Sequence, residues 1–180
     1  NIKKSFKSTK FKILEIKNLK LNKIIKINIK NKKNLGSDRI ANAIGAKKLK
    51  NCLIIDFGTA TTFDVIKNGI YEGGVIAPGV NLSIKNLSQA TALLPLINLK
   101  TNQKSYGKNT IEALNAGFVW GYEGLINNII DKIISRSKIK YKILLTGGYA
   151  NFFNKMIKKK VVTDQDITIK GIANAYKELI

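Results

Sequence analysis

Apolar and polar positions alternate in blocks along the chain, and the clearest block spans residues 53–66, Leu-Ile-Ile-Asp-Phe-Gly-Thr-Ala-Thr-Thr-Phe-Asp-Val-Ile. An apolar run ends at Asp56, a glycine-containing turn follows, and a second apolar run begins at once. Apolar, β-branched runs of this length on either side of a glycine predict a β-hairpin. Asn68-Gly69 then predicts a tight turn, and residues 70–76 predict a third antiparallel strand.

Apolar positions spaced three and four residues apart predict helices in the rest of the chain. Asn109 followed by Glu112 matches a capping box, which opens a long helix that we expect to end near Arg136. Shorter helices are expected to start at residues 36–38 and to span 82–92, 151–157 and 167–179, with strands at 25–29, 142–146 and 161–162. The apolar cluster at 11–16 is a further candidate strand.

The long helix has an unusual glycine content. Gly117, Gly121 and Gly124 lie near its apolar stripe, and each glycine costs a helix interior up to ~1 kcal/mol relative to alanine. Close packing against another helix would explain their presence. The predicted stripe consists of Ile111, Leu114, Phe118, Tyr122, Leu125, Ile129 and Ile133.

Length and composition indicate a globular protein of one domain, or of one domain and part of another. The chain has 180 residues, 44% of them hydrophobic, and a mean hydropathy of −0.06. No apolar run approaches the ~18 to 20 residues that a membrane span needs, and no signal peptide is visible. We therefore expect no membrane partner and a cytoplasmic location.

The formal net charge of +21 raises the possibility of a nucleic-acid-binding module. Arg39 and Arg136 are the only arginines, however, and nucleic-acid recognition favours the arginine fork over the lysine ammonium group. The lysines are scattered along the chain. We therefore expect a solvated lysine surface and no nucleic-acid partner.

Histidine is absent from the sequence, and Cys52 is the only cysteine. Serine–histidine and cysteine–histidine catalysis, an intrachain disulfide and a cysteine zinc cluster are therefore excluded. Any general base must come from the 11 carboxylates or from a perturbed Lys, Tyr or Cys. We interpret Cys52 as a core residue.

The turn of the predicted hairpin has the residue types of a phosphate or cation site. Thr59, Thr61 and Thr62 place hydroxyls beside Asp56 and Asp64. Backbone amides and hydroxyls suit phosphate oxygens, and a carboxylate suits a hard cation. Taken alone, the same residues favour an ordinary hairpin with a polar turn.

Residues 53–66 resemble the second phosphate-handling motif of type III pantothenate kinases, members of the acetate and sugar kinase, actin-like superfamily. Four more blocks match that family in order: Leu-Gly-Ser-Asp-Arg-Ile-Ala-Asn-Ala (35–43), Gly-Gly-Val-Ile-Ala-Pro-Gly-Val (73–80), Gly-Lys-Asn-Thr (107–110) and Leu-Thr-Gly-Gly-Tyr-Ala (145–150). The resemblance implies an α/β fold of actin-like, ribonuclease H-like lobes with a mixed sheet flanked by helices. It places residues 1–50 at the end of a first lobe and 51–180 in a complete second lobe.

The resemblance implies a transferase that phosphorylates pantothenate with ATP, the first step of coenzyme A biosynthesis. Asp38 would be the catalytic base, with Mg²⁺ accompanying ATP and a homodimer as the active form. The other implied contacts are Gly36, Ser37, Asp38, Arg39 and Thr110 to pantothenate, Thr59 to ATP, and Asp56 to a monovalent cation, K⁺ or NH₄⁺. Without the resemblance, Asp38 reads as a helix-start carboxylate and Thr110 as a helix-start threonine.

Three departures from the family pattern are visible. Nothing in residues 1–34 matches the Asp-x-Gly-Asn-Thr phosphate loop that opens the family's first lobe, so we expect an N-terminally truncated kinase that is inactive alone. Ile29 and Lys32 replace a tyrosine and a proline that usually shape the substrate pocket, and Asp64 has no assigned role. A non-catalytic regulatory relative is the alternative, although Asp38, Arg39, Asp56, Thr59 and Thr110 together argue against it.

Overall fold

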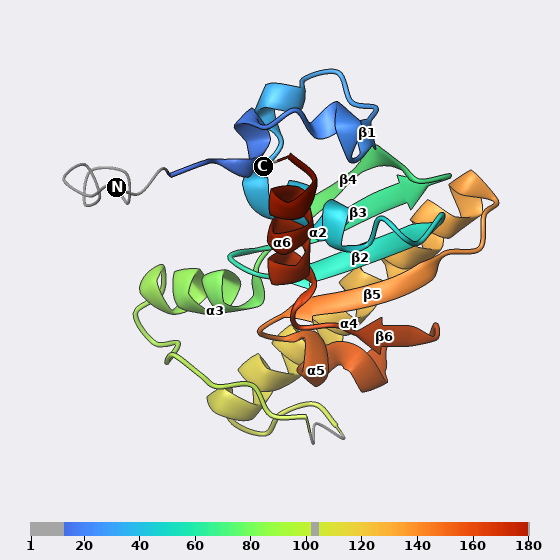
Figure 1. The fold of residues 1–180 in the computed structure, drawn as a ribbon. Coiled ribbons are helices and arrows are strands. Elements are labelled where there is room, and N and C mark those ends of the chain that lie inside the picture. The colour runs from blue at the N-terminus through green and yellow to red at the C-terminus, as the bar shows by residue number, and fades with distance from the viewer. Residues whose placement is uncertain (1–12, 102–104, 180) are drawn as a thin grey trace.

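The computed structural model describes residues 13–101 and 105–179, which form a mixed six-stranded sheet with helices on both faces (Figure 1). The strands are β1 (Lys26–Ile27), β2 (Cys52–Phe57), β3 (Ala60–Lys67), β4 (Ile70–Pro78), β5 (Lys142–Gly147) and β6 (Val161–Thr163). The α-helices are α2 (Ser37–Gly45), α3 (Val80–Gln89), α4 (Thr110–Ser137), α5 (Ala150–Phe153) and α6 (Ile167–Leu179). Short 3₁₀ turns are η1 (Ile16–Asn18), η2 (Leu21–Lys23), η3 (Lys32–Asn34) and η4 (Asn154–Met156).

The strands lie in the order β1-β4-β3-β2-β5-β6. β2, β3 and β4 form the predicted antiparallel meander, with Asn68 and Gly69 at positive φ in the turn between β3 and β4. β5 lies parallel to β2, β6 parallel to β5, and β1 parallel to β4. The succession of three strands, two helices and then alternating strands and helices confirms the predicted actin-like α/β lobe.

The two faces of the sheet carry different layers of helices. Alternate residues of β2 point to opposite faces, so Leu53, Ile55 and Phe57 pack with α3, α4 and α5. Cys52 and Ile54 pack instead with α2 and α6, which lie together on the near face in Figure 1. Cys52 is fully buried, as predicted, and burial raises the pKa of its thiol to about 12.

The near layer depends on an unusually close crossing of α2 and α6. A Cβ atom added to Gly45 would collide with the Ile167 carbonyl oxygen, and one added to Gly171 would collide with the Ala41 carbonyl oxygen. The two helices therefore approach backbone to backbone. This contact holds α6 against α2, although most of the sequence lies between the two helices.

Several predicted boundaries need correction. The strand predicted at 25–29 is shorter in the structure, where it is β1. The described residues of the candidate strand at 11–16 form no strand, and Ile16 begins η1. Phe11 lies outside the described residues. The helix predicted at 82–92 is α3, which begins at Val80, directly after the Pro78-Gly79 break. The helix predicted at 151–157 is split into α5 and η4. The long helix and the helix at 167–179 are confirmed.

The glycine face of α4 is open in the single chain. Cβ atoms added to Gly117, Gly121 and Gly124 would meet nothing within 4 Å. The deeply buried stripe lies beside the predicted one and includes Val119, Ile126 and Ile130, while most of the predicted positions are half-buried. Within the described part of the chain, therefore, no helix covers these glycines.

The amino-terminal segment packs on the same sheet as the rest of the chain. β1 extends the sheet next to β4, and α2 packs on α6. The lobe boundary near residue 50 stays a prediction. No described helix has the combined length and apolarity required to cross a membrane.

Candidate active site

Two carboxylates lie side by side on the sheet face beneath α2. Asp56 is on β2 and Asp64 on β3, where the register pairs Asp56 with Thr62 and Ile54 with Asp64. Both side chains therefore point to the α2 face rather than to the α4 face. Asp64 is fully buried and Asp56 is half-buried.

Asp64 holds Arg39 of α2 in a buried ion pair. The Nε and Nη2 atoms of Arg39 both lie 2.7 Å from Oδ1 of Asp64, and the Tyr71 hydroxyl donates to the same oxygen at 2.7 Å. Burial raises the pKa of Asp64, and the Arg39 charge opposes that shift. Tyr71 is nearly fully buried, and burial together with Asp64 raises the pKa of its phenol. Asp64 therefore anchors the guanidinium group of Arg39.

Among the described residues, Oδ2 of Asp56 accepts a side-chain hydrogen bond and Oδ1 accepts none. The side-chain amide of Asn42 donates to Oδ2 at 2.8 Å, and Thr168 of α6 donates to Oδ1 of Asn42 at 2.6 Å. Oδ1 of Asp56 lies against Gly147, where an added Cβ atom would come within 2.7 Å of it. Burial raises the pKa of Asp56, the Asn42 hydrogen bond lowers it, and the nearby charge of Asp38 raises it.

Asp38 lies exposed in the first turn of α2, after Gly36 and Ser37. Its carboxylate bends back over the helix start, because a Cβ atom on Gly36 would collide with Oδ1 of Asp38. Its charge acts on both Asp56 and Asp64. The structure thus brings Asp38, Arg39, Asp56 and Asp64 into one acidic group with a single bound cation side chain.

Thr59 lies at the exposed tip of the β2–β3 hairpin, beside a hollow of about 290 Å³. Gly148 follows β5 on one side, and Asn81 and Lys85 of α3 lie on the other. The Tyr149 hydroxyl donates to Oδ1 of Asn81 at 2.6 Å, which joins the two sides. The hollow combines a hydroxyl, an ammonium group and glycine backbone, a set that suits a phosphorylated ligand.

Thr110 lies apart from these groups. It begins α4 and lines an apolar hollow of about 390 Å³ between α3 and α4, together with Leu87, Phe118 and Gly117. No residue of the acidic group lines this hollow. Within one chain, the structure does not bring Thr110 to Asp38.

Sequence reasoning missed five residues of this region. Asn42 and Thr168 support Asp56, and Lys85, Asn81 and Tyr149 line the hollow at Thr59. Asn42 had a visible signal, because an amide stands on the buried face of α2 among Ile40, Ala43 and Ile44. Tyr149 belongs to the 145–150 block but was assigned no role, and Thr168, Lys85 and Asn81 gave no comparable signal, because they meet their partners only through the tertiary fold.

The metal-binding capacity of the site is limited. The described residues contain no group of three or more acidic or thiol side chains that could enclose a metal ion. The open Oδ1 atom of Asp56 offers one anionic oxygen. A single carboxylate oxygen of this kind fits a weakly held monovalent cation better than a cage for a divalent ion.

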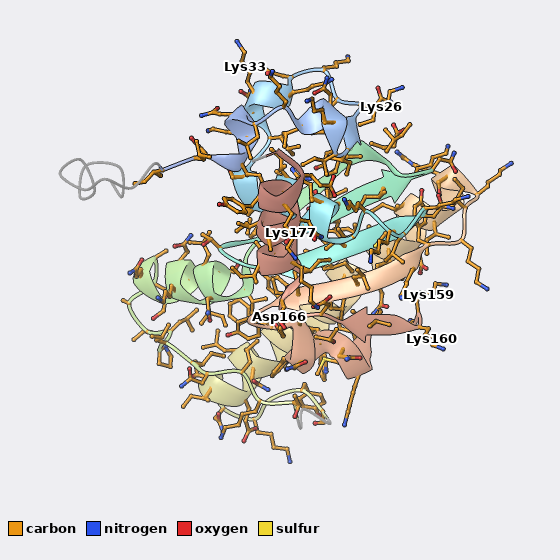
Figure 2. All side chains as sticks on the ribbon, in the orientation of Figure 1. Lys26, Lys33, Lys159, Lys160, Asp166 and Lys177 are labelled. Atoms are coloured by element: carbon orange, nitrogen blue, oxygen red, sulfur yellow. The ribbon has the colours of Figure 1, made fainter. Side chains whose placement is uncertain are left out.

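The positive surface is separate from the acidic group. Lys26, Lys33, Lys159 and Lys160 are exposed, and Figure 2 labels these four lysines toward the edges of the molecule. Lys159 lies 3.3 Å from an oxygen of Asp131. These exposed lysines, which contribute to the high net charge, therefore do not belong to the acidic group around Asp38.

Comparison with known proteins agrees with the motifs and the fold. A family model described as type III pantothenate kinase matches residues 1–132. The type III pantothenate kinase of Pelagibacter ubique is 52% identical over 167 residues, which cover 92% of this chain and 67% of that protein. The type III pantothenate kinase of Acidiphilium cryptum is 42% identical over 149 residues, which cover 81% of this chain and 56% of that protein.

A solved structure shares the fold. The crystal structure of a Campylobacter jejuni protein described as a conserved Baf family transcriptional activator superposes with a TM-score of 0.64 and 25% identity, over 87% of this chain and 70% of that one. The matched part of this chain amounts to 67% of the length of the Pelagibacter ubique protein and 56% of the length of the Acidiphilium cryptum protein. The family model covers well over half of the chain, and the chain belongs to the type III pantothenate kinase family.

Proposed function

We propose that this protein phosphorylates pantothenate with ATP to give phosphopantothenate and ADP, the first step of coenzyme A biosynthesis. The observation that carries the proposal is the acidic group at the start of α2, in which Asp38 lies exposed beside an anchored Arg39. Phosphoryl transfer requires chiefly positioning and charge stabilisation. An exposed carboxylate beside a fixed guanidinium group meets both needs.

Asp38 is the proposed base. It is exposed, so a substrate hydroxyl can reach it, whereas Asp64 is buried and bound by four donor atoms. Arg39, held by Asp64, faces the carboxylate of pantothenate together with the backbone of Gly36 and Ser37. In this proposal, Asp38 accepts the proton of the substrate hydroxyl, and Arg39 orients the carboxylate of pantothenate.

The hollow at Thr59 is the proposed place of ATP. The Thr59 hydroxyl and the Lys85 ammonium group would contact phosphate oxygens, and Gly148 leaves room for the nucleotide. Asp56 would hold the monovalent cation, K⁺ or NH₄⁺, through its open Oδ1 atom. Mg²⁺ would arrive with ATP and neutralise phosphate charge. We propose the cytoplasm as the location of this reaction.

We further propose a homodimer that uses the open glycine face of α4. Thr110 and Gly117 line the apolar hollow beside this face, so a second copy of the chain would cover both. This arrangement would give Thr110 access to pantothenate at the interface. It also gives the uncovered glycines a packing partner.

The activity is tested by following phosphopantothenate formation by mass spectrometry, with ATP and pantothenate varied independently. The 180-residue chain is expected to be inactive alone and to gain activity in a chimera that adds an upstream segment with the family's Asp-x-Gly-Asn-Thr loop. Failure of the folded chimera to form product, with ATP and pantothenate at saturation, would contradict the proposed function. Product formation by the isolated chain would contradict only the expected need for the loop.

The dimer is tested by light scattering on Gly121→Leu, because a leucine side chain on a packed glycine face prevents close approach. Ala173→Leu is the matched control, since Ala173 is an exposed residue of α6. We expect a dimeric mass for the parent and the control and a monomeric mass for Gly121→Leu. A monomeric parent would remove the dimer from the proposal.

A further inference from the structure

A chain of two hydrogen bonds connects α6 to the acidic group through the interior of the near layer. Thr168 donates to Oδ1 of Asn42 at 2.6 Å, and Nδ2 of Asn42 donates to Oδ2 of Asp56 at 2.8 Å. Asn42 is fully buried, and Thr168 is half-buried. The three residues belong to α6, α2 and β2, so the chain crosses the helical layer down to the sheet.

The backbone geometry of the near layer makes this connection possible. Gly45 and Gly171 allow α2 and α6 to touch backbone to backbone on either side of the Thr168–Asn42 hydrogen bond. A threonine side chain is short, and its hydroxyl can reach Asn42 only because the helices are this close. The crossing therefore places the hydroxyl group as well as packing the helices.

Asp56 sets the direction of the Asn42 amide, and Thr168 holds the amide in that direction. An asparagine side chain carries an acceptor oxygen and a donor nitrogen in nearly the same shape, so a flip of the amide exchanges them. An ionised carboxylate only accepts, so the nitrogen faces Asp56 and the oxygen accepts from the Thr168 hydroxyl. The reverse orientation would place a carbonyl oxygen against a carboxylate oxygen.

We propose that Thr168 and Asn42 are positioning residues that hold the Asp56 carboxylate with Oδ2 bound and Oδ1 turned toward Gly147. The cation-binding role of Asp56 belongs to the proposed function, and this inference rests on it only for its catalytic consequence. The orientation of Asp56 itself is a property of the fold. It can be measured without any assay of turnover.

The surroundings of Asp56 leave few other groups that could set its state. Asp38 on α2 is the charged group that acts on it from the same layer. Its direct strand partners are uncharged, Thr62 on β3 and Thr146 on β5, and the nearby Asp64 of β3 is bound to Arg39. Lys170 of α6 binds both oxygens of Asp164. The Asn42 amide is thus the main polar support of the carboxylate.

The test is the pKa of Asp56, followed by carboxyl ¹³C NMR in the folded 180-residue chain and assigned with Asp56→Asn. Loss of the Thr168 hydroxyl in Thr168→Val should raise the pKa of Asp56 by about 0.5 to 1 pH unit, the scale of one lost hydrogen bond. Thr168→Ser keeps the hydroxyl group and should leave the pKa of Asp56 near its parent value.

Thr163→Val is the matched control. Thr163 is also half-buried, and its hydroxyl accepts from an asparagine amide, Nδ2 of Asn154, at 2.9 Å, but it lies on β6 away from Asp56. We expect no change in the pKa of Asp56 in this variant. An Asp56 pKa that is the same in Thr168→Val, Thr163→Val and the parent would overturn the proposal.

A second measurement covers the case in which Thr168→Val does not fold. In the parent chain, the side-chain amide protons of Asn42 should shift with the same midpoint as the Asp56 carboxyl group. An Asn42 signal that does not respond to the Asp56 titration would also overturn the proposal. The catalytic consequence is a severalfold higher K⁺ requirement for Thr168→Val in the active chimera. A raised Asp56 pKa without that change would retain the positioning role and reject the cation role of Asp56.

Discussion

The two faces of the central sheet have the same strands and opposite chemistry. On the α4 face, Phe57, Phe63 and Leu145 join an apolar core in which Phe153 stacks on Phe57 with ring centroids 5.6 Å apart. On the α2 face, Asp56 and Asp64 alternate with those residues and carry buried or half-buried charge. Both faces therefore hold an apolar core, and alternation along the strands adds the residues of the proposed chemistry to the α2 face alone.

The two faces differ in the free energy of burying their side chains. Apolar burial on the α4 face contributes favourable transfer free energy, roughly 25 cal/mol per Å². Burial on the α2 face removes carboxylates from water, and partners such as Arg39 and Asn42 offset only part of that penalty. Substitutions on the two faces should thus affect different observables.

The largest expected effect is on stability at the α4 face. Phe63 is fully buried there, and Phe63→Ala should lower the free energy of unfolding by about 3 to 5 kcal/mol in urea titrations. Ile76→Ala, at an apolar residue that is 63% exposed on β4, should lower it by less than ~1 kcal/mol. Equal losses at the two positions would contradict the burial of Phe63 in the core of this face.

The next effect is on catalysis at the α2 face. Asp38→Asn in the active chimera should reduce kcat by roughly 10²-fold or more, the scale of a lost general base, with Tm unchanged. Asparagine has nearly the same size and can still interact with the start of α2. A variant with near-parental turnover would remove Asp38 from the mechanism and leave it as a helix-start residue.

A smaller effect separates two kinds of glycine. Gly171→Ala forces α6 away from the Ala41 carbonyl oxygen and should cost about 1 to 3 kcal/mol of stability. Gly121→Ala meets nothing within 4 Å in the single chain and should stabilise a monomer by up to ~1 kcal/mol. Urea titration of both variants is the measurement. A destabilising Gly121→Ala would indicate that the α4 glycine face is covered in solution.

The smallest effect is a gain of stability on the α2 face. Burial raises the pKa of Asp56 above its ordinary value of 3.8, so ionisation of Asp56 destabilises the folded state as the pH rises through the raised pKa. Asp56→Asn should therefore raise Tm at neutral pH, by about 1 to 2 °C because Asp56 is partly screened by water. Below pH 3.8 both states are protonated, so the gain should vanish. A gain that persists there would have another cause.

Local patterns allowed most of the fold to be predicted. The hairpin around Asp56 and the start of α4 follow from turn and capping chemistry, and Asn109 accepts from the Glu112 amide at 3.0 Å as the capping box requires. The length of β1 was overestimated, because a strand at the edge of a sheet has a neighbouring strand on one side only. The position of the buried stripe on α4 depends on which neighbours cover it, and sequence spacing does not contain that information.

Less of the site than of the fold could be predicted from the sequence. The motif blocks indicated Asp38, Arg39, Asp56 and Thr59, and their assigned roles stay predictions. The partner of Arg39 could not be predicted, because Asp64 meets it only when β3 and α2 are packed. Thr168 lies 126 residues from Asn42, and no local pattern links two such positions.

The contact between α2 and α6 also has a consequence for the order of events during synthesis. Residues 37–67 contain α2 and the Asp56 hairpin, but the hydroxyl group that binds Asn42 comes from residue 168. A ribosome making this chain would release the acidic group long before Thr168 emerges. The nascent lobe could therefore assemble its sheet early, but it would hold Asp56 in its final orientation only after the α6 segment had left the exit tunnel.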